Sequence, residues 1–227
     1  MKNILSYRLI LIFACIFLPI FFLILGIYGS FLFTFSIPIL WQIGIKKKSL
    51  SSLGINKKIS LFSFSFGLMS GILFGLLGIA ILRTLGIRGY LLTGREIILG
   101  FSLKKELGYS LLSRNRFIFF LYCSFLVGLG EELFWRGFIQ QRIKNYFNKD
   151  FSIWLTSIIF SLVHFYLFFV IGSFFITSLM LIAIFLLGLF WGYVFERYKN
   201  IFLNAFSHGI SAFIFWSYFF RRSRFGF

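Results

Sequence analysis

Long apolar runs make up most of this chain, and they limit the folds that it can adopt. A helix needs about 20 consecutive apolar residues to cross the hydrocarbon core of a bilayer, and runs near that length recur between residues 9 and 220. Hydrophobic residues fill 59% of the 227 positions and charged residues 13%, whereas soluble domains carry roughly 25% charged residues. The mean hydropathy is +0.94. The sequence therefore predicts an all-α, polytopic membrane bundle of about 7–8 transmembrane helices.

The expected helices follow from the glycines, prolines and charges that interrupt the apolar runs. We predict spanning helices at residues 9–25, 30–45, 60–82, 117–135, 151–170 and 201–220, and another from the turn at Gly172 and Ser173 to Phe195. The first is expected to be an uncleaved helix, and the fourth to continue along the surface to about Lys144. Residues 96–112 are expected to form an amphipathic helix at the membrane interface.

Three glycines of the third predicted helix, Gly67, Gly71 and Gly75, are spaced by four residues and so share one face. Small residues at this spacing let helices approach closely, although glycines are also tolerated in lipid without such a role. Cys15 and Cys123 lie in apolar runs, where a buried, inert thiol is expected.

The formal net charge of +17 comes from 23 Lys and Arg residues spread through loops and termini. This distribution is typical of membrane proteins, in which basic residues orient helices and lie among lipid headgroups. We therefore expect membrane lipids, and no nucleic acid, as partners of the basic surface. The densest cluster of basic residues consists of Lys46, Lys47, Lys48, Lys57 and Lys58. Because basic loops tend to stay inside, this cluster predicts that its loop lies in the cytoplasm. The overall topology stays open because the other basic residues are divided almost evenly between the two sides.

Polar residues inside the apolar runs are the candidates for a functional site. Glu131 and Glu132 are adjacent, and Arg136 follows Glu132 by one helical turn. His164 and His208, the two histidines of the chain, interrupt two other runs. Singly, each residue is compatible with a helix end among headgroups or with a satisfied core histidine. Together they favour one shared site, because ionisable groups at membrane depth are usually paired or functional.

This set of side chains allows two kinds of chemistry. Glutamate and histidine can activate water, and a histidine or an amide can donate to an oxyanion. Two histidines and a carboxylate can also bind zinc. A Ser-His-Asp triad lacks support because the single aspartate, Asp150, lies in a basic loop.

Three segments resemble motifs of a known family. Residues 131–137, Glu-Glu-Leu-Phe-Trp-Arg-Gly, resemble the EExxxRG motif of the CPBP family, the membrane proteases that include the type II CAAX prenyl endopeptidases. Residues 160–164, Phe-Ser-Leu-Val-His, resemble its FxxxH motif, and residues 188–200, leading to His208, resemble the approach to its third motif. The resemblance extends over about residues 117–212 and uses both histidines.

The resemblance implies one membrane domain in two parts. Residues 1–116 would supply N-terminal transmembrane helices and the interfacial amphipathic segment, and residues 117–227 would form a CPBP-like catalytic core. It also implies roles for individual residues, with Phe160 as a structural motif residue. Glu131 would be the general base that activates water together with His164.

The same resemblance assigns His208 to stabilisation of the oxyanion, and Glu132 with Arg136 to a charge pair that shapes the site. It favours a metal-free mechanism without a cofactor. If zinc is bound instead, Glu131, His164 and His208 are the expected ligands.

One position departs from the family pattern. The third motif usually reads HxxxN, and its last position here is Ala212. An alanine side chain cannot donate to an oxyanion, so one donor is in question. Asn204 and Ser211 are the nearby candidates to supply the missing polar group.

The leading interpretation is an integral, multi-pass membrane endopeptidase, in the cell membrane if the source is prokaryotic. It would hydrolyse a peptide bond near the membrane in a membrane-anchored or membrane-proximal protein. One alternative is a zinc-dependent version of the protease. Another, favoured by Ala212, is a non-catalytic protein of the same fold that acts by partner binding, for example in bacteriocin self-immunity. A small-solute transporter would show internal repeats and broken helices, which we do not find in the sequence.

Overall fold

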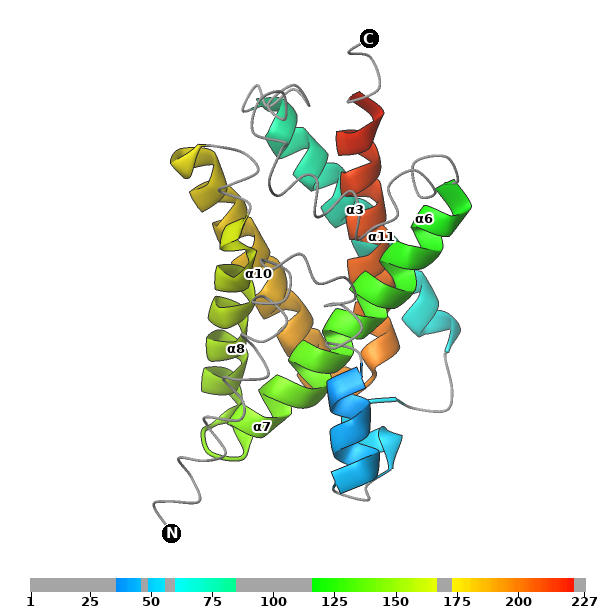
Figure 1. Cartoon of the computed structure of the whole chain (residues 1–227), viewed down its shortest axis with the longest axis vertical. Coiled ribbons are helices and arrows are strands. Elements are labelled where there is room, and N and C mark those ends of the chain that lie inside the picture. The colour runs from blue at the N-terminus through cyan, green and yellow to red at the C-terminus, as the bar shows by residue number, and fades with distance from the viewer. Residues whose placement is uncertain (1–35, 46–48, 56–59, 85–115, 167–172, 223–227) are drawn as a thin grey trace.

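The computed structural model describes residues 36–45, 49–55, 60–84, 116–166 and 173–222 (Figure 1). Every regular element within these ranges is helical, as predicted. The predicted helix at 9–25, the first residues of that at 30–45, the lysine cluster, Gly172 and the amphipathic helix at 96–112 lie outside the described residues. The number of spanning helices therefore stays a prediction.

Two helices of the described chain are long and apolar enough to cross a bilayer, α3 (Leu61–Thr84) and α10 (Phe174–Tyr198). Their outward faces carry large apolar side chains, such as Met69 and Leu186, which are 71% and 57% exposed. A continuous apolar surface of this kind is rare on soluble monomers but is the normal surface of a helix in lipid. A shorter apolar stretch, Ile201–Phe215, begins α11 (Ile201–Arg222).

A single helix from residue 116 to residue 144, which we call the motif helix, crosses the middle of the structure (green in Figure 1). It runs through α6 (Arg116–Tyr122), η4 (Cys123–Gly130), Glu131 and Glu132, η5 (Leu133–Gln140) and α7 (Gln141–Lys144). The predicted continuation of the helix to Lys144 is thus present, but the prediction that it runs along the surface is wrong, because all of η5 is buried. The sequence did not predict that η4 and η5 would be π-helical. The main buried apolar cluster surrounds η5, with Leu53 and residues of α8, α10 and α11 packed onto it.

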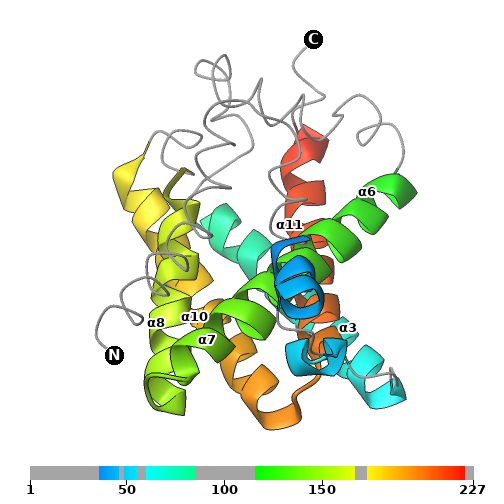
Figure 2. The same ribbon diagram turned by 60° about the horizontal axis from the view of Figure 1, so that its bottom comes forward.

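The other helices flank the motif helix in two pairs. α8 (Lys149–Val163) lies beside α10, and α3 lies beside α11 (Figure 1). Two short segments, residues 36–45 with η1 (Leu40–Ile45) and residues 49–53 with η2 (Leu50–Leu53), lie beside the motif helix, where η2 contacts η5 (Figure 2). There the Trp41 ring meets Phe138 edge-on at 6.0 Å. The guanidinium of Arg142 also lies 4.9 Å from the centre of the Trp41 ring.

Glycines bring α11 into backbone contact with helices on both sides. A Cβ atom on Gly71 would lie 2.7 Å from the Ser207 carbonyl oxygen, and one on Gly75 would lie 2.7 Å from the Ile214 Cβ. Gly67 meets Phe206 in the same way. On the other side of α11, a Cβ on Gly209 would lie 2.8 Å from the Ser124 Cα of the motif helix. The close-packing alternative for the glycine face of α3 is therefore confirmed.

The end of α8 differs from the prediction. The sequence predicts a helix through residues 151–170, but α8 ends at Val163 and passes into the 3-10 turn η6 (His164–Tyr166); residues 167–170 lie outside the described residues. The His164 Nδ1 donates to the Phe160 carbonyl at 2.7 Å, the acceptor that the His164 amide would use in an α-helix. That amide bonds Ser161 instead. The side chain of His164 thus competes with the backbone for the last α-helical hydrogen bond.

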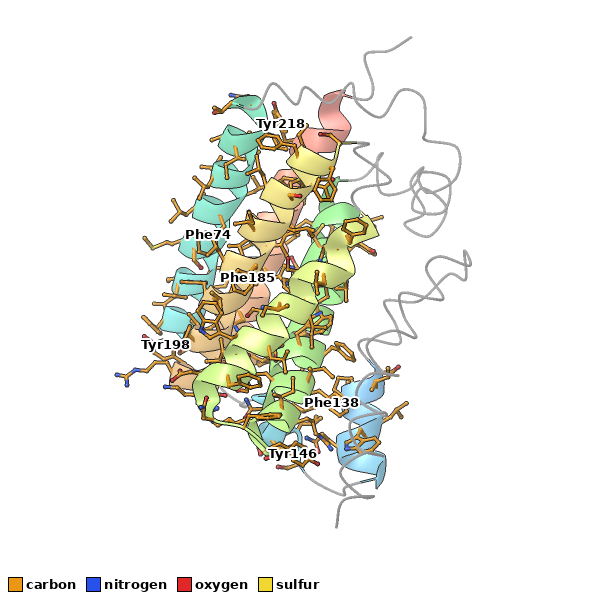
Figure 3. All side chains as sticks on the ribbon, turned by 90° about the vertical axis from the view of Figure 1, so that its left-hand side faces the viewer. Phe74, Phe138, Tyr146, Phe185, Tyr198 and Tyr218 are labelled. Carbon is orange, nitrogen blue, oxygen red and sulfur yellow. The ribbon has the colours of Figure 1, made fainter. Side chains whose placement is uncertain are left out.

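Polar residues mark the two ends of the helices. Figure 3 shows Tyr218 at one end and Tyr146 at the other, and Arg83 at the end of α3 donates to the Tyr218 hydroxyl at 3.3 Å. At the Tyr146 end, the Glu196 carboxylate accepts from Lys144 at 2.5 Å and from Lys199 at 2.7 Å. The hydrogen bond to Glu196 raises the pKa of Lys144 above its ordinary value. Tyrosines and lysines in these positions are typical of membrane–water interfaces.

Candidate active site

Glu131 and Glu132 occupy the short α-helical stretch between the two π-helical segments of the motif helix. Successive side chains on a helix point about 100° apart, so the two carboxylates enter different surroundings. Glu131 is 8% exposed and Glu132 is completely buried. π-Helical turns inside longer helices are frequent at functional sites.

Glu132 is the centre of a buried network that joins three helices. Its Oε1 accepts from Arg136 at 2.8 Å and from the His208 Nδ1 at 2.9 Å. Its Oε2 accepts from the Asn204 Nδ2 at 3.2 Å. The predicted Glu132–Arg136 charge pair is therefore present. The contacts with His208 and Asn204 were not predicted for Glu132, and they connect the motif helix to α11.

Arg136 is fully buried and is held on several sides. Besides Glu132, it donates to the Gly188 carbonyl at 3.3 Å. Its guanidinium lies 4.7 Å from the centre of the Phe160 ring and 5.4 Å from that of Trp191. A desolvated cation over an aromatic face gains electrostatic attraction from the ring. Phe160, for which the resemblance implies a structural role, therefore packs against the cation of the site.

Glu131 has different surroundings from Glu132. Within the described residues, its Oε2 is buried and has no hydrogen-bond partner. The imidazoles of His164 and His208 both contact the ring of Phe160, so these two residues lie near one another although they come from η6 and α11. That Glu131 shares a site with them stays a prediction.

Both histidines have a fixed proton position. The Phe160 carbonyl and the Glu132 carboxylate accept hydrogen bonds, so the Nδ1 of His164 and the Nδ1 of His208 each carry a proton. In a neutral ring this places the lone pair on Nε2. The Phe160 ring lies between the two imidazoles, at 4.9 Å from His164 and 6.0 Å from His208.

The sequence analysis missed Trp191, which stacks on the His208 ring with 4.3 Å between centroids and 18° between planes. Its indole Nε1 donates to the Ser207 Oγ at 3.0 Å. The sequence contains one indication that this tryptophan has a polar partner. A tryptophan inside an apolar run needs an acceptor for its N–H group, and few polar side chains in neighbouring runs can supply one.

The two candidates for the missing polar group have different partners. The Asn204 amide donates to Glu132 and to the Trp191 carbonyl, the latter at 2.6 Å. The Ser211 hydroxyl donates to the His208 carbonyl within α11 at 2.8 Å. Asn204 therefore belongs to the Glu132 network, whereas the Ser211 proton is engaged by its own helix. Ala212 is half-buried on α11.

The ligand set considered for zinc does not fit a metal centre. Across the described part of the chain, no three His, Cys, Asp or Glu side chains are placed so that they could hold a metal ion. We therefore derive no reaction step through a metal.

A family comparison accounts for this set of residues. The model of the type II CAAX prenyl endopeptidase Rce1-like family matches residues 113–214. This region of the chain belongs to that family. The match includes every site residue discussed above, from Glu131 to Ala212, and confirms the family that the three motifs predicted. No curated protein and no solved structure is similar enough to the chain to count as a match.

The Rce1-like assignment also agrees with the composition of the helices. The two long apolar helices within the described residues and the match of residues 113–214 to a membrane protease family indicate an integral membrane protein. The buried Glu132–His208 pair, at 2.9 Å, is consistent with a catalytic site in the Rce1-like region.

Proposed function

We propose that this protein is an intramembrane endopeptidase that hydrolyses a peptide bond near the membrane, using water activated by Glu131 and His164. One observation carries the proposal. The two adjacent glutamates have separate tasks, because Glu132 binds three donors whereas Glu131 keeps one buried oxygen without a partner among the described residues. An engaged carboxylate orients its neighbours, and a carboxylate with a remaining acceptor oxygen can take a proton.

In the proposed reaction Glu131 accepts and returns a proton, and Glu132 orients its neighbours. A water molecule attacks the peptide carbonyl carbon while its proton passes to Glu131, with His164 orienting the water through Nε2. The carbonyl oxygen becomes an oxyanion. The Nε2–H of protonated His208 donates to that oxygen, and Glu132 balances the charge of the imidazolium through Nδ1. The C–N bond then breaks, and Glu131 returns the proton to the leaving amine, which leaves the enzyme unchanged.

The proposal includes the surroundings and the substrate class. The protein would be a multi-pass protein, of the cell membrane if prokaryotic, with residues 117–227 as its catalytic core and residues 1–116 as additional membrane helices. Its substrates would be membrane-anchored or membrane-proximal proteins, of which a prenylated C-terminal CAAX sequence is the class named by the family. Lipids, and not nucleic acid, would surround its basic loops.

The decisive experiment replaces Glu131 by Gln in the full chain, purified in detergent and reconstituted in liposomes. The probe is a peptide ending in a prenylated CAAX sequence, with a fluorophore and a quencher on either side of the scissile region. Since Gln keeps the shape but cannot accept the proton, cleavage should fall by roughly 10²–10⁴-fold. Asp150→Asn is the matched control, because the Asp150 side chain is 63% exposed and lies in the first turn of α8.

A second readout covers substrates of another sequence. The termini of membrane proteins are compared between cells that produce the wild type and cells that produce Glu131→Gln, and new termini should appear only with the wild type. Full activity of Glu131→Gln would remove the base from the mechanism. Absence of cleavage in both assays would favour the alternative raised by Ala212, a non-catalytic protein of the same fold that acts by binding a partner.

A further inference from the structure

Trp191 lies at the centre of the candidate site, and the proposed reaction assigns it no task. The residue is 2% exposed, and one face of its ring covers the His208 imidazole at 4.3 Å. The Arg136 guanidinium lies 5.4 Å from the centre of the same ring. A buried tryptophan in an apolar run usually contacts apolar neighbours. Besides its neighbours in the apolar cluster, the ring touches His208, a residue that can act in catalysis, and Arg136, the cation that neutralises Glu132.

Polar contacts hold the indole at two points. The Nε1 donates to the Ser207 Oγ at 3.0 Å. The Ser207 Oγ also lies within hydrogen-bond distance, 3.0 Å, of the Ser70 Oγ of α3, whose hydroxyl proton is shared with the Phe66 carbonyl at 2.6 Å. The Trp191 carbonyl accepts from Asn204 at 2.6 Å. In a low-dielectric interior, losing the Nε1 bond would leave a buried donor unsatisfied. The indole plane is therefore fixed by α3 and α11, and not by packing alone.

The orientation of the His208 ring depends on both Glu132 and this plane. The Nδ1–Glu132 hydrogen bond of 2.9 Å sets the position of one ring atom, but the ring can still rotate about the line of that bond. Stacking at 18° on Trp191 removes this rotation. The two contacts together determine the direction in which Nε2 points, and the proposed mechanism needs Nε2 to point at the developing oxyanion.

We propose that Trp191, held by Ser207 and Ser70, is a positioning residue that sets the orientation of His208. The proposal rests on the proposed function, because it concerns the nitrogen that would donate to the oxyanion. Trp191 acts through His208 and does not touch the reacting atoms. The Ser70–Ser207–Trp191 contacts also extend the site to α3, whose sequence carries no family motif.

Three variants separate positioning from packing. Ser207→Ala removes the acceptor of the indole N–H and keeps the ring. Ser70→Ala removes the contact from α3 but replaces no atom of Trp191, His208 or Ser207, so its effect on His208 should be the smallest of the three. Trp191→Phe keeps an aromatic face and loses the donor. The matched control is Trp154→Phe, since Trp154 is 48% exposed on α8.

The first measurement does not require activity. With ¹⁵N-labelled histidine in the full chain, four ring nitrogens are observed, because the protein has two histidines. The wild type should carry a proton on the Nδ1 of His208. In Ser207→Ala, and more weakly in Ser70→Ala, a population of His208 with the proton on Nε2 alone should appear while the His164 signals stay unchanged. Trp154→Phe should change neither histidine. Identical His208 protonation in the wild type, Ser207→Ala and Trp191→Phe would overturn the proposal.

The second measurement is cleavage of the prenylated CAAX probe at matched amounts of folded protein. Misplacement of a catalytic group by about 1 Å can cost roughly 10²-fold, so Ser207→Ala should lose kcat on that order or somewhat less, with KM little changed. A loss confined to KM would also overturn positioning of His208. An inactive wild type would instead count against the proposed function, and the histidine spectra would still decide the role of Trp191.

Discussion

Replacing Glu132 by Gln tests how the buried network stabilises the protein. In the wild type the completely buried carboxylate accepts from Arg136, His208 and Asn204. Gln has the same shape, but it has no charge and offers one acceptor oxygen to these three donors. Arg136 would keep its contacts with Phe160, Trp191 and the Gly188 carbonyl. These contacts exist in both proteins, so they do not offset the loss.

The expected destabilisation follows from the missing charge. Removing one partner of a buried ion pair costs about 3–5 kcal/mol, because the remaining charge is buried without compensation. For a chain of this size, each kcal/mol lowers Tm by about 2–4 °C. Glu132→Gln should therefore lower Tm by roughly 6–20 °C. Glu196→Gln is the comparison. The Glu196 side chain is only 5% exposed, but those of its partners Lys144 and Lys199 are 34% and 47% exposed and can be hydrated when the carboxylate is lost, so the decrease in Tm should be smaller than for Glu132→Gln.

The assay is thermal unfolding of the purified variants in one detergent, followed by circular dichroism. The double variant Glu132→Gln/Arg136→Met removes both charges, and such replacements are often neutral or stabilising. It should regain most of the lost stability but no activity, because His208 has lost its carboxylate. A Glu132→Gln protein as stable as the wild type would refute the argument. So would a double variant less stable than the single one.

Two further predictions concern the site. Asn204→Ala should lower activity beyond any loss of folded protein, because Asn204 donates to Glu132, and Ala212→Asn should be neutral or activating. Equal turnover by the wild type and Asn204→Ala at matched folded protein would show that Asn204 only packs the helix. Exhaustive chelation should leave cleavage unchanged and elemental analysis should find no stoichiometric zinc, whereas about one zinc per chain, lost in His164→Ala, would support a zinc-bound water.

Much of the site could be predicted because its residues interrupt apolar runs. Glu131, Glu132, His164 and His208 stand out in a chain with six acidic residues and two histidines. Their motifs identified the family, and Arg136 was paired correctly because its partner is one helical turn away. The bounds of α10 and α11 were also close to those predicted, since polar residues mark their ends.

Long-range partners could not be predicted in the same way. Asn204 was a candidate to supply the missing polar group, but the sequence could not show that its partners are Glu132 and the Trp191 carbonyl. Ser70 and Ser207 are 137 residues apart, and no local pattern relates them. Trp191 resembles any apolar core residue until its N–H group is placed. The π-helical segments could not be predicted either, because the spacing of apolar and polar residues in η4 and η5 does not distinguish a π-helix from an α-helix with 3.6 residues per turn.

The glycines that surround α11 make the geometry of the site sensitive to small displacements of the neighbouring helices. Backbone meets backbone at Gly71 on one side and at Gly209 on the other, so no side chain lies between the helices to absorb a displacement by changing its rotamer. A shift of either neighbouring helix is therefore transmitted undiminished to His208, the residue next to Gly209. These close contacts would keep the catalytic geometry the same from molecule to molecule. They also mean that no flexible side chain compensates for a displaced helix. A methyl group added at Gly209 would meet the backbone of the motif helix and push that helix, which carries Glu132, away from α11, which carries His208.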